Sequence, residues 1–149
     1  MKNYKKFNFI DLFAGAGGFS EGFLQAEYND KIFEFILASD INDNCELTHE
    51  FRYNKQLNLD IQFLKKDITS NDFLIELKNS LGEKGVNIDE VDVVTGGPPC
   101  QSFSLAGQRR SNDKKDDLFA HYLKVIKFLK PKYFVMENVP GILTKYDGK

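Results

Sequence analysis

Short apolar segments alternate along the chain with longer segments in which apolar residues recur at helical spacing. The apolar segments that predict buried strands are 7–13, 34–39, 61–65, 90–95 and 133–136. The segments whose spacing predicts helices are 18–25, 44–53, 70–81 and 118–129. Ser70 or Asn71 could cap the third of these helices. Because strands and helices alternate throughout, we expect an α/β fold with a doubly wound, mainly parallel sheet.

The composition is that of a soluble globular domain. Of 149 residues, 42% are hydrophobic and 28% are charged, which is enough apolar surface to bury a core. The 20 basic and 22 acidic side chains give a net charge of -2. A freestanding nucleic-acid-binding domain would usually be basic, so this balance argues against one.

The apolar segments and the cysteines indicate the compartment. No apolar run approaches the roughly 20 residues that a membrane span requires. The apolar stretch after Lys6 is too short, and too soon interrupted by acid, for a signal peptide. Two cysteines, Cys45 and Cys100, make neither a disulfide framework nor a metal site, and they fit a reducing environment. We therefore expect a cytoplasmic protein.

The first candidate site is a glycine-rich segment that runs from Asp11 to Ser20. Its glycines follow the first predicted strand and open the first predicted helix, where nucleotides bind in doubly wound sheets. Glycine lets the backbone approach a ligand closely, and the start of the helix offers free N–H groups. The spacing is neither a full G-x-G-x-x-G nor a P-loop. Taken alone, such a turn is equally an ordinary connection between a strand and a helix.

Two acidic residues follow the next predicted strands. Asp40 ends the second strand, 22 positions after Gly18, where an acid commonly binds the hydroxyls of a ribose. Asp67 follows the third strand. Each of them, considered alone, could instead be a helix cap or a turn residue.

The remaining candidates follow the last two strands. Cys100 comes after Gly96 and a Pro-Pro pair, in a polar loop that favours a reactive thiol over a structural one. Glu137 ends the final strand and would face the same crevice, where it could act as a general acid. The alternative for Glu137 is an ordinary loop carboxylate.

In this order, these segments resemble the cytosine-5 DNA methyltransferase family. The glycine-rich segment resembles the family's S-adenosylmethionine motif, residues 97–104 (Gly-Pro-Pro-Cys-Gln-Ser-Phe-Ser) its catalytic loop, and residues 137–139 (Glu-Asn-Val) its third hallmark. The resemblance extends from Phe9 to about Leu143. It implies a Rossmann-like, S-adenosylmethionine-dependent methyltransferase fold and methylation of cytosine C5 in double-stranded DNA, as in restriction–modification systems.

The resemblance also implies roles for the matching residues. Those implied to bind the cofactor are Phe13, Gly15, Gly17, Gly18, Asp40, Ile41, Asp67, Ile68, Pro99 and Leu118. Among them, Asp40 would bind the ribose hydroxyls and Asp67 the adenine amino group. Cys100 would be the nucleophile that adds to C6 of a flipped cytosine, and Glu137 would bind and protonate N3.

The loop after the cysteine would contact DNA. Its implied contact residues are Gln101, Ser104, Arg109 and Arg110. Arg109, Arg110, Lys114 and Lys115 outnumber Asp113, which suits contact with phosphates.

Other parts of the family pattern do not occur in residues 1–149. These are a further arginine-bearing motif, a target-recognition domain and a closing C-terminal motif. We therefore expect residues 1–149 to be the N-terminal portion of a catalytic and cofactor-binding domain, inactive by itself. The sheet would be incomplete at its C-terminal side, so the apolar strand 133–136 would form an open edge prone to self-association.

Two alternatives stay open. The chain could be a relative that methylates cytosine in tRNA, because that branch shares the same hallmarks. It could also be a non-catalytic cofactor-binding fragment, or one subunit of a split enzyme.

Overall fold

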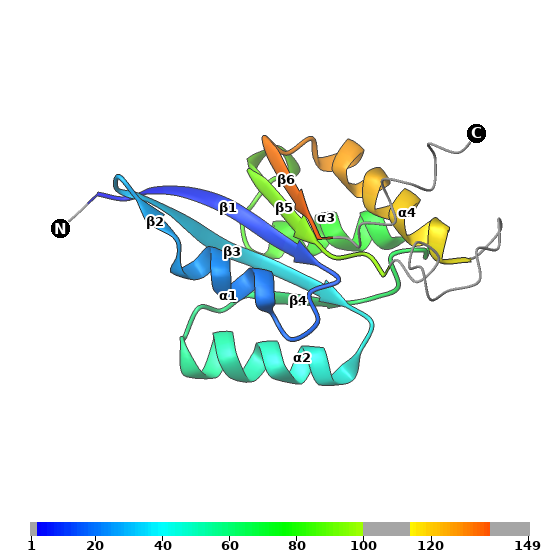
Figure 1. The fold of residues 1–149 in the computed structure, drawn as a ribbon, viewed down its shortest axis with the longest axis horizontal. Helices are drawn as coiled ribbons and strands as arrows, with labels where there is room; N and C mark the ends of the chain where they lie inside the picture. The colour runs from blue at the N-terminus through cyan, green and yellow to red at the C-terminus, as the bar shows by residue number, and fades with distance from the viewer. Residues whose placement is uncertain (1–2, 100–113, 138–149) are drawn as a thin grey trace.

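A computed structural model describes residues 3–99 and 114–137, which form one sheet with helices on both faces (Figure 1). The strands are β1 (Lys5–Leu12), β2 (Glu27–Tyr28), β3 (Lys31–Asp40), β4 (Gln62–Lys65), β5 (Val93–Gly96) and β6 (Tyr133–Met136). The helices are α1 (Gly18–Gln25), α2 (Asp43–His49), α3 (Phe73–Glu83) and α4 (Lys114–Leu129), with a π-helix η1 (Glu50–Gln56) and a 3₁₀-helix η2 (Ile88–Glu90). This architecture confirms the predicted doubly wound, mainly parallel α/β fold.

The order of the strands places one reversal in the middle of the sheet. β3 pairs with β1 on one side, and with β4 and the short antiparallel β2 on the other. The chain thus runs outward from β1 through β3 to β4, then returns to the opposite side of β1 as β5 and continues outward to β6. In open α/β sheets, ligands bind beyond the carboxyl ends of the strands at such a reversal.

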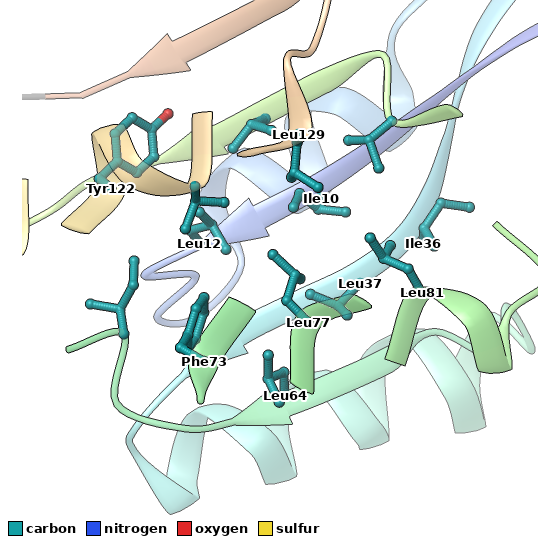
Figure 2. Packing of buried hydrophobic residues seen from close by; sticks show 14 residues of the cluster. Ile10, Leu12, Ile36, Leu37, Leu64, Phe73, Leu77, Leu81, Tyr122 and Leu129 are labelled. Atoms are coloured by element: carbon teal, nitrogen blue, oxygen red, sulfur yellow. The ribbon is translucent and has the colours of Figure 1, made fainter. Parts of the chain in front are cut away.

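Both faces of the central strands are buried, which is typical of parallel sheets. Phe9 and Val93 pack on the face covered by α1, whereas Ile10 and Val94 pack on the face covered by α3 and α4. Figure 2 shows the second of these cores, where residues of β1, β3 and β4 meet the apolar sides of α3 and α4. The continuous apolar runs in the sequence follow from this two-sided burial.

Leu77 of α3 is fully buried in the core that Figure 2 shows. We expect Leu77→Ala to lower the free energy of unfolding by about 2–5 kcal/mol, because it leaves a cavity among packed side chains. Ile75, on the same helix, is 62% exposed, so Ile75→Ala should change this free energy by less than about 0.5 kcal/mol. Urea unfolding followed by circular dichroism measures both, and equal effects would contradict this assignment of the buried face.

Three local predictions need correction. Neither Ser70 nor Asn71 caps α3: its N-cap is Asp72, and the Ser70 hydroxyl instead donates to the carbonyl oxygen of Asp67 at 2.7 Å. The expected helix over 44–53 changes its hydrogen-bonding pattern at Glu50 and becomes the π-helix η1. Lys114 and Lys115 were expected in the loop after the cysteine, but they begin α4.

Within the described part of the chain, no helix combines the length and the apolar character that crossing a lipid bilayer would require.

Candidate cofactor site

A cavity of about 360 Å³ opens at the carboxyl ends of β1, β3, β4 and β5. Its lining residues are Leu12, Phe13, Ser39, Asp40, Ile41, Lys66, Asp67, Ile68, Gly97, Pro99 and Leu118. The structure therefore brings together all the residues predicted to bind the cofactor except the three glycines. Leu12, Ser39, Lys66 and Gly97 also line the cavity, although none of them was predicted to bind the cofactor.

The turn between β1 and α1 has an unusual backbone. Phe13, Gly15 and Gly17 all have positive φ angles, of 54°, 52° and 91°. A positive φ is uncommon for a bulky residue such as Phe13, and residues held in this way concentrate at functional sites. The Ala14 amide donates to the carbonyl oxygen of Ser39 at 3.1 Å, which fixes the turn against the end of β3.

The Asp40 side chain lines the cavity and also hydrogen-bonds to this turn. Its Oδ2 accepts from the Gly15 amide at 3.0 Å, and its Oδ1 accepts from the Asn42 amide at 3.0 Å. Each carboxylate oxygen has two lone pairs, so each retains one for a ligand hydroxyl. The predicted turn role and the predicted ligand role are thus compatible at this residue.

Asp67 and Ile68 form the opposite wall, beyond β4. The Oδ1 atom of Asp67 accepts from both the amide and the hydroxyl of Thr69, each at 2.8 Å, so this carboxylate also shapes its own turn. Asp67 is exposed and Ile68 is buried. The pair therefore presents one polar and one apolar group to the same cavity.

A buried polar cluster lies beneath the site. The carboxylate of Asp11 accepts from the Ser20 hydroxyl at 2.6 Å and from the Thr95 hydroxyl at 2.7 Å. Burial raises the pKa of Asp11, while these two hydrogen bonds oppose the rise. The cluster ties the start of α1 to β1 and β5. One signal in the sequence indicated this cluster, namely an acid near the end of an otherwise apolar strand.

Glu137 lies beside the end of β5. Its amide donates to the carbonyl oxygen of Gly96 at 3.1 Å, directly after β6. A methyl group at Gly97 would approach Glu137 Oε2 to 3.3 Å, so the carboxylate lies against the backbone that leads to Pro99. The Glu137 side chain is exposed, at the edge of the sheet where the cavity opens.

The other predicted catalytic and DNA-contacting residues lie outside the described residues. These are Cys100, Gln101, Ser104, Arg109 and Arg110. Their roles, like those of the residues that line the cavity, stay predictions.

The fold is that of a Rossmann-like methyltransferase. The Entamoeba histolytica methyltransferase EhMeth superposes with a TM-score of 0.62 at 23% identity, over 95% of this chain and 41% of that one. An S-adenosylmethionine-dependent methyltransferase from Clostridium acetobutylicum superposes with a TM-score of 0.50 at 16% identity, over 92% of this chain and 41% of that one.

Residues 7–149 match the model of the C-5 cytosine-specific DNA methylase family, and the chain belongs to that family. It is 41% identical over 137 residues to the type II methyltransferase M.DdeI of Desulfomicrobium norvegicum, covering 92% of this chain and 29% of the relative. M.XorII of Xanthomonas oryzae is 41% identical, covering 89% of this chain and 28% of the relative. M.AquIA of Picosynechococcus is 38% identical, covering 94% of this chain and 51% of the relative. The chain thus spans from about a quarter to half of the length of these relatives.

The family assignment confirms the resemblance seen in the sequence. Because this family uses S-adenosylmethionine, the predicted cofactor is confirmed at the level of the family.

Proposed function

We propose that this chain provides the cofactor site and the nucleophile of a DNA (cytosine-5)-methyltransferase of a restriction–modification system. One observation carries the proposal. The side chains that the family pattern assigns to the cofactor come from four separate strand ends and from α4, and they line a single cavity. The match to the C-5 cytosine-specific DNA methylase family supports DNA as the substrate.

The residues of the cavity fit S-adenosylmethionine. Phe13, Ile41 and Ile68 offer apolar surface for the adenine ring, and Asp40 retains lone pairs for the ribose hydroxyls. Asp67 presents a carboxylate that can accept from the adenine amino group. When bound, S-adenosylmethionine supplies an electrophilic methyl group on its sulfonium.

The chain's own residues would activate the target base. Cytosine C5 is a poor nucleophile, and addition of the Cys100 thiolate to C6 would make it electron-rich. Glu137, protonated, would hold N3 and neutralise the negative charge that develops on the ring. After methylation, loss of the C5 proton would expel the Cys100 thiolate and restore the aromatic ring. Both groups require the base to be flipped out of the duplex.

Methyl transfer tests this proposal. The protein to use is the encoded protein, meaning the complete product of the reading frame that contains this chain. We expect it to transfer a labelled methyl group to cytosine C5 in duplex DNA and not in tRNA. Transfer to tRNA alone would show that the substrate is tRNA and not DNA. Binding of S-adenosylmethionine without transfer to either nucleic acid would indicate instead that the protein is a non-catalytic, cofactor-binding subunit.

Residues 1–149 produced alone should self-associate through β6. Among the described residues, β6 pairs only with β5, and its Tyr133, Phe134 and Val135 are 71%, 51% and 39% exposed. These three side chains line a groove of about 530 Å³ that Phe7, Phe23 and Phe33 also help to form. An open apolar strand invites pairing with another chain, which here would be a second copy.

Light scattering measures this association, and a charged residue on the strand should weaken it. We expect Tyr133→Lys to shift the protein toward monomer. Leu47→Lys, at a position that is 65% exposed on α2, serves as the control and should have no effect. A wild-type chain that stays monomeric at high concentration would contradict the prediction.

A further inference from the structure

The helix after β3 contains a π-helical turn that the sequence did not predict. α2 ends at His49 and η1 continues from Glu50 to Gln56. Such turns are rare, and they are frequent at functional sites because they shift the side chains that follow. Here the turn carries Tyr53, which is 1% exposed and lies under the glycine turn of the cofactor site.

The hydroxyl of Tyr53 contacts the glycine turn directly. It donates to the carbonyl oxygen of Gly17 at 3.2 Å, between residues 36 positions apart. Burial raises the pKa of Tyr53 to about 12, so the hydroxyl keeps its proton at neutral pH and acts as a donor. Gly17 is the N-cap of α1 with φ 91°, and a methyl group there would lie 2.5 Å from Tyr53 Oη. The hydroxyl therefore occupies the space that the absent side chain leaves.

Aromatic neighbours hold Tyr53 in place. Its ring meets that of Phe35 edge-on, with centroids 5.1 Å apart, and lies 5.1 Å from the ring of His49. His49 is fully buried and its Nδ1 lies 2.9 Å from the Cys45 carbonyl oxygen. A methyl group at Gly17 would lie 3.4 Å from His49 Nε2, so His49 also faces the turn. These contacts leave the Tyr53 ring little freedom to move away from Gly17.

We propose that Tyr53 is a positioning residue that fixes the left-handed glycine turn through the Gly17 carbonyl and thereby sets the affinity for S-adenosylmethionine. The inference rests on the function proposed above. Tyr53 does not line the cavity. Its effect would pass through the turn, whose backbone shapes the start of α1 and holds Asp40 through Gly15.

Tyr53→Phe tests the inference, and Tyr122→Phe is the matched control. Tyr122 is also fully buried, and its hydroxyl donates to a backbone carbonyl, that of Val135 at 3.4 Å, away from the glycine turn. In the encoded protein, we expect Tyr53→Phe to weaken binding of S-adenosylmethionine about five- to ten-fold, the worth of one buried hydrogen bond. The KM for the methyl donor should rise while kcat at saturating donor stays unchanged. Tyr122→Phe should move neither quantity.

Hydrogen exchange without cofactor provides a second, independent measurement. Tyr53→Phe should accelerate amide exchange at Gly17 and Gly18, and Tyr122→Phe should not. Equal binding and equal exchange in Tyr53→Phe and the wild type would overturn the positioning role, as would equal losses in both variants. If the wild-type protein binds no S-adenosylmethionine, the proposed function fails instead, and the exchange measurement alone decides the role of Tyr53 in fixing the turn.

Discussion

Replacing Cys100 by serine should abolish methyl transfer by the encoded protein. We expect a loss of at least about a thousand-fold, which is the scale on which enzymes lose activity without their nucleophile. A serine hydroxyl stays protonated near neutral pH, so it cannot add to cytosine C6 as a thiolate does. Transfer of a labelled methyl group to duplex DNA measures the loss. Binding of S-adenosylmethionine should stay within about two-fold of the wild type, because the change removes no group assigned to the cofactor.

Cys45 supplies the control for this experiment. It is half-buried on α2, and burial, followed by the nearby charge of Asp40, raises the pKa of its thiol. Such a thiol stays protonated and is a poor nucleophile. Cys45→Ser should therefore keep methyl transfer within about two-fold. DNA that carries a thiol-trapping cytosine analogue should capture the wild type and Cys45→Ser but not Cys100→Ser. Capture of Cys100→Ser would refute the assignment of the nucleophile.

Residues 1–149 alone should give no such capture, since they span only part of the length of their relatives. Covalent capture by this segment alone would show instead that residues 1–149 are sufficient for the first chemical step.

Replacing Asp40 by alanine should weaken binding of S-adenosylmethionine about a hundred-fold. Hydrogen bonds to a charged group contribute about 1.5–3 kcal/mol each, and the change also removes the acceptor that holds the Gly15 amide. Asp40→Asn should have an intermediate effect, because its single carbonyl oxygen can replace only one of the two carboxylate oxygens. Calorimetric titration of the encoded protein with S-adenosylmethionine measures both variants.

The control for Asp40 is another aspartate nearby in the sequence. Asp43 begins α2 and pairs with Lys65, and its side chain is 83% exposed. An exposed ion pair contributes little, so Asp43→Ala should change binding by less than about two-fold. A similar loss in both variants would show that general charge, rather than the position of Asp40 in the cavity, determines the affinity.

The pattern of apolar residues predicted the bounds of those elements that have a clear signal in the sequence near one end. α1 and β6 have the bounds that the sequence predicted, at Gly18–Gln25 and Tyr133–Met136. In both cases a glycine or proline lies within two residues of the start of the element, and the apolar spacing indicates its extent. The start of α4 was missed because its first residues are charged and carry no apolar periodicity.

The strand β2 and the π-helical pattern of η1 were not predicted, for different reasons. The hairpin from β2 to β3 turns at Asn29 and Asp30, which both have positive φ angles, of 48° and 58°. Such a pair is a typical two-residue hairpin turn, so the signal was present in the sequence. The π-helix η1 left no comparable signal, because a local change in hydrogen bonding leaves the apolar pattern almost intact.

Most of the candidate site was predictable because its groups follow strand ends and belong to recognisable motifs. Phe13, Asp40, Asp67 and Pro99 are far apart in the sequence, yet a parallel sheet brings their positions to one edge. Tyr53 and Lys66 belong to no such motif, and their place near the site depends on packing. Apolar spacing and motifs report which strand a residue follows, but they do not report which side chain reaches a neighbouring turn.

The central position of β1 has a consequence for how the site assembles. Among the described strands, β1 is synthesised before the others, yet its partner β5 comes late, and the Asp11–Thr95 hydrogen bond joins residues 84 positions apart. Closing so long a loop costs entropy before any contact repays it, so pairing of this kind is slow. The parts of the cavity lining that contain Asp40 and Asp67 can thus form before the part that contains Pro99 and Leu118. A ligand that touches all of these residues stabilises only the chain that has finished folding.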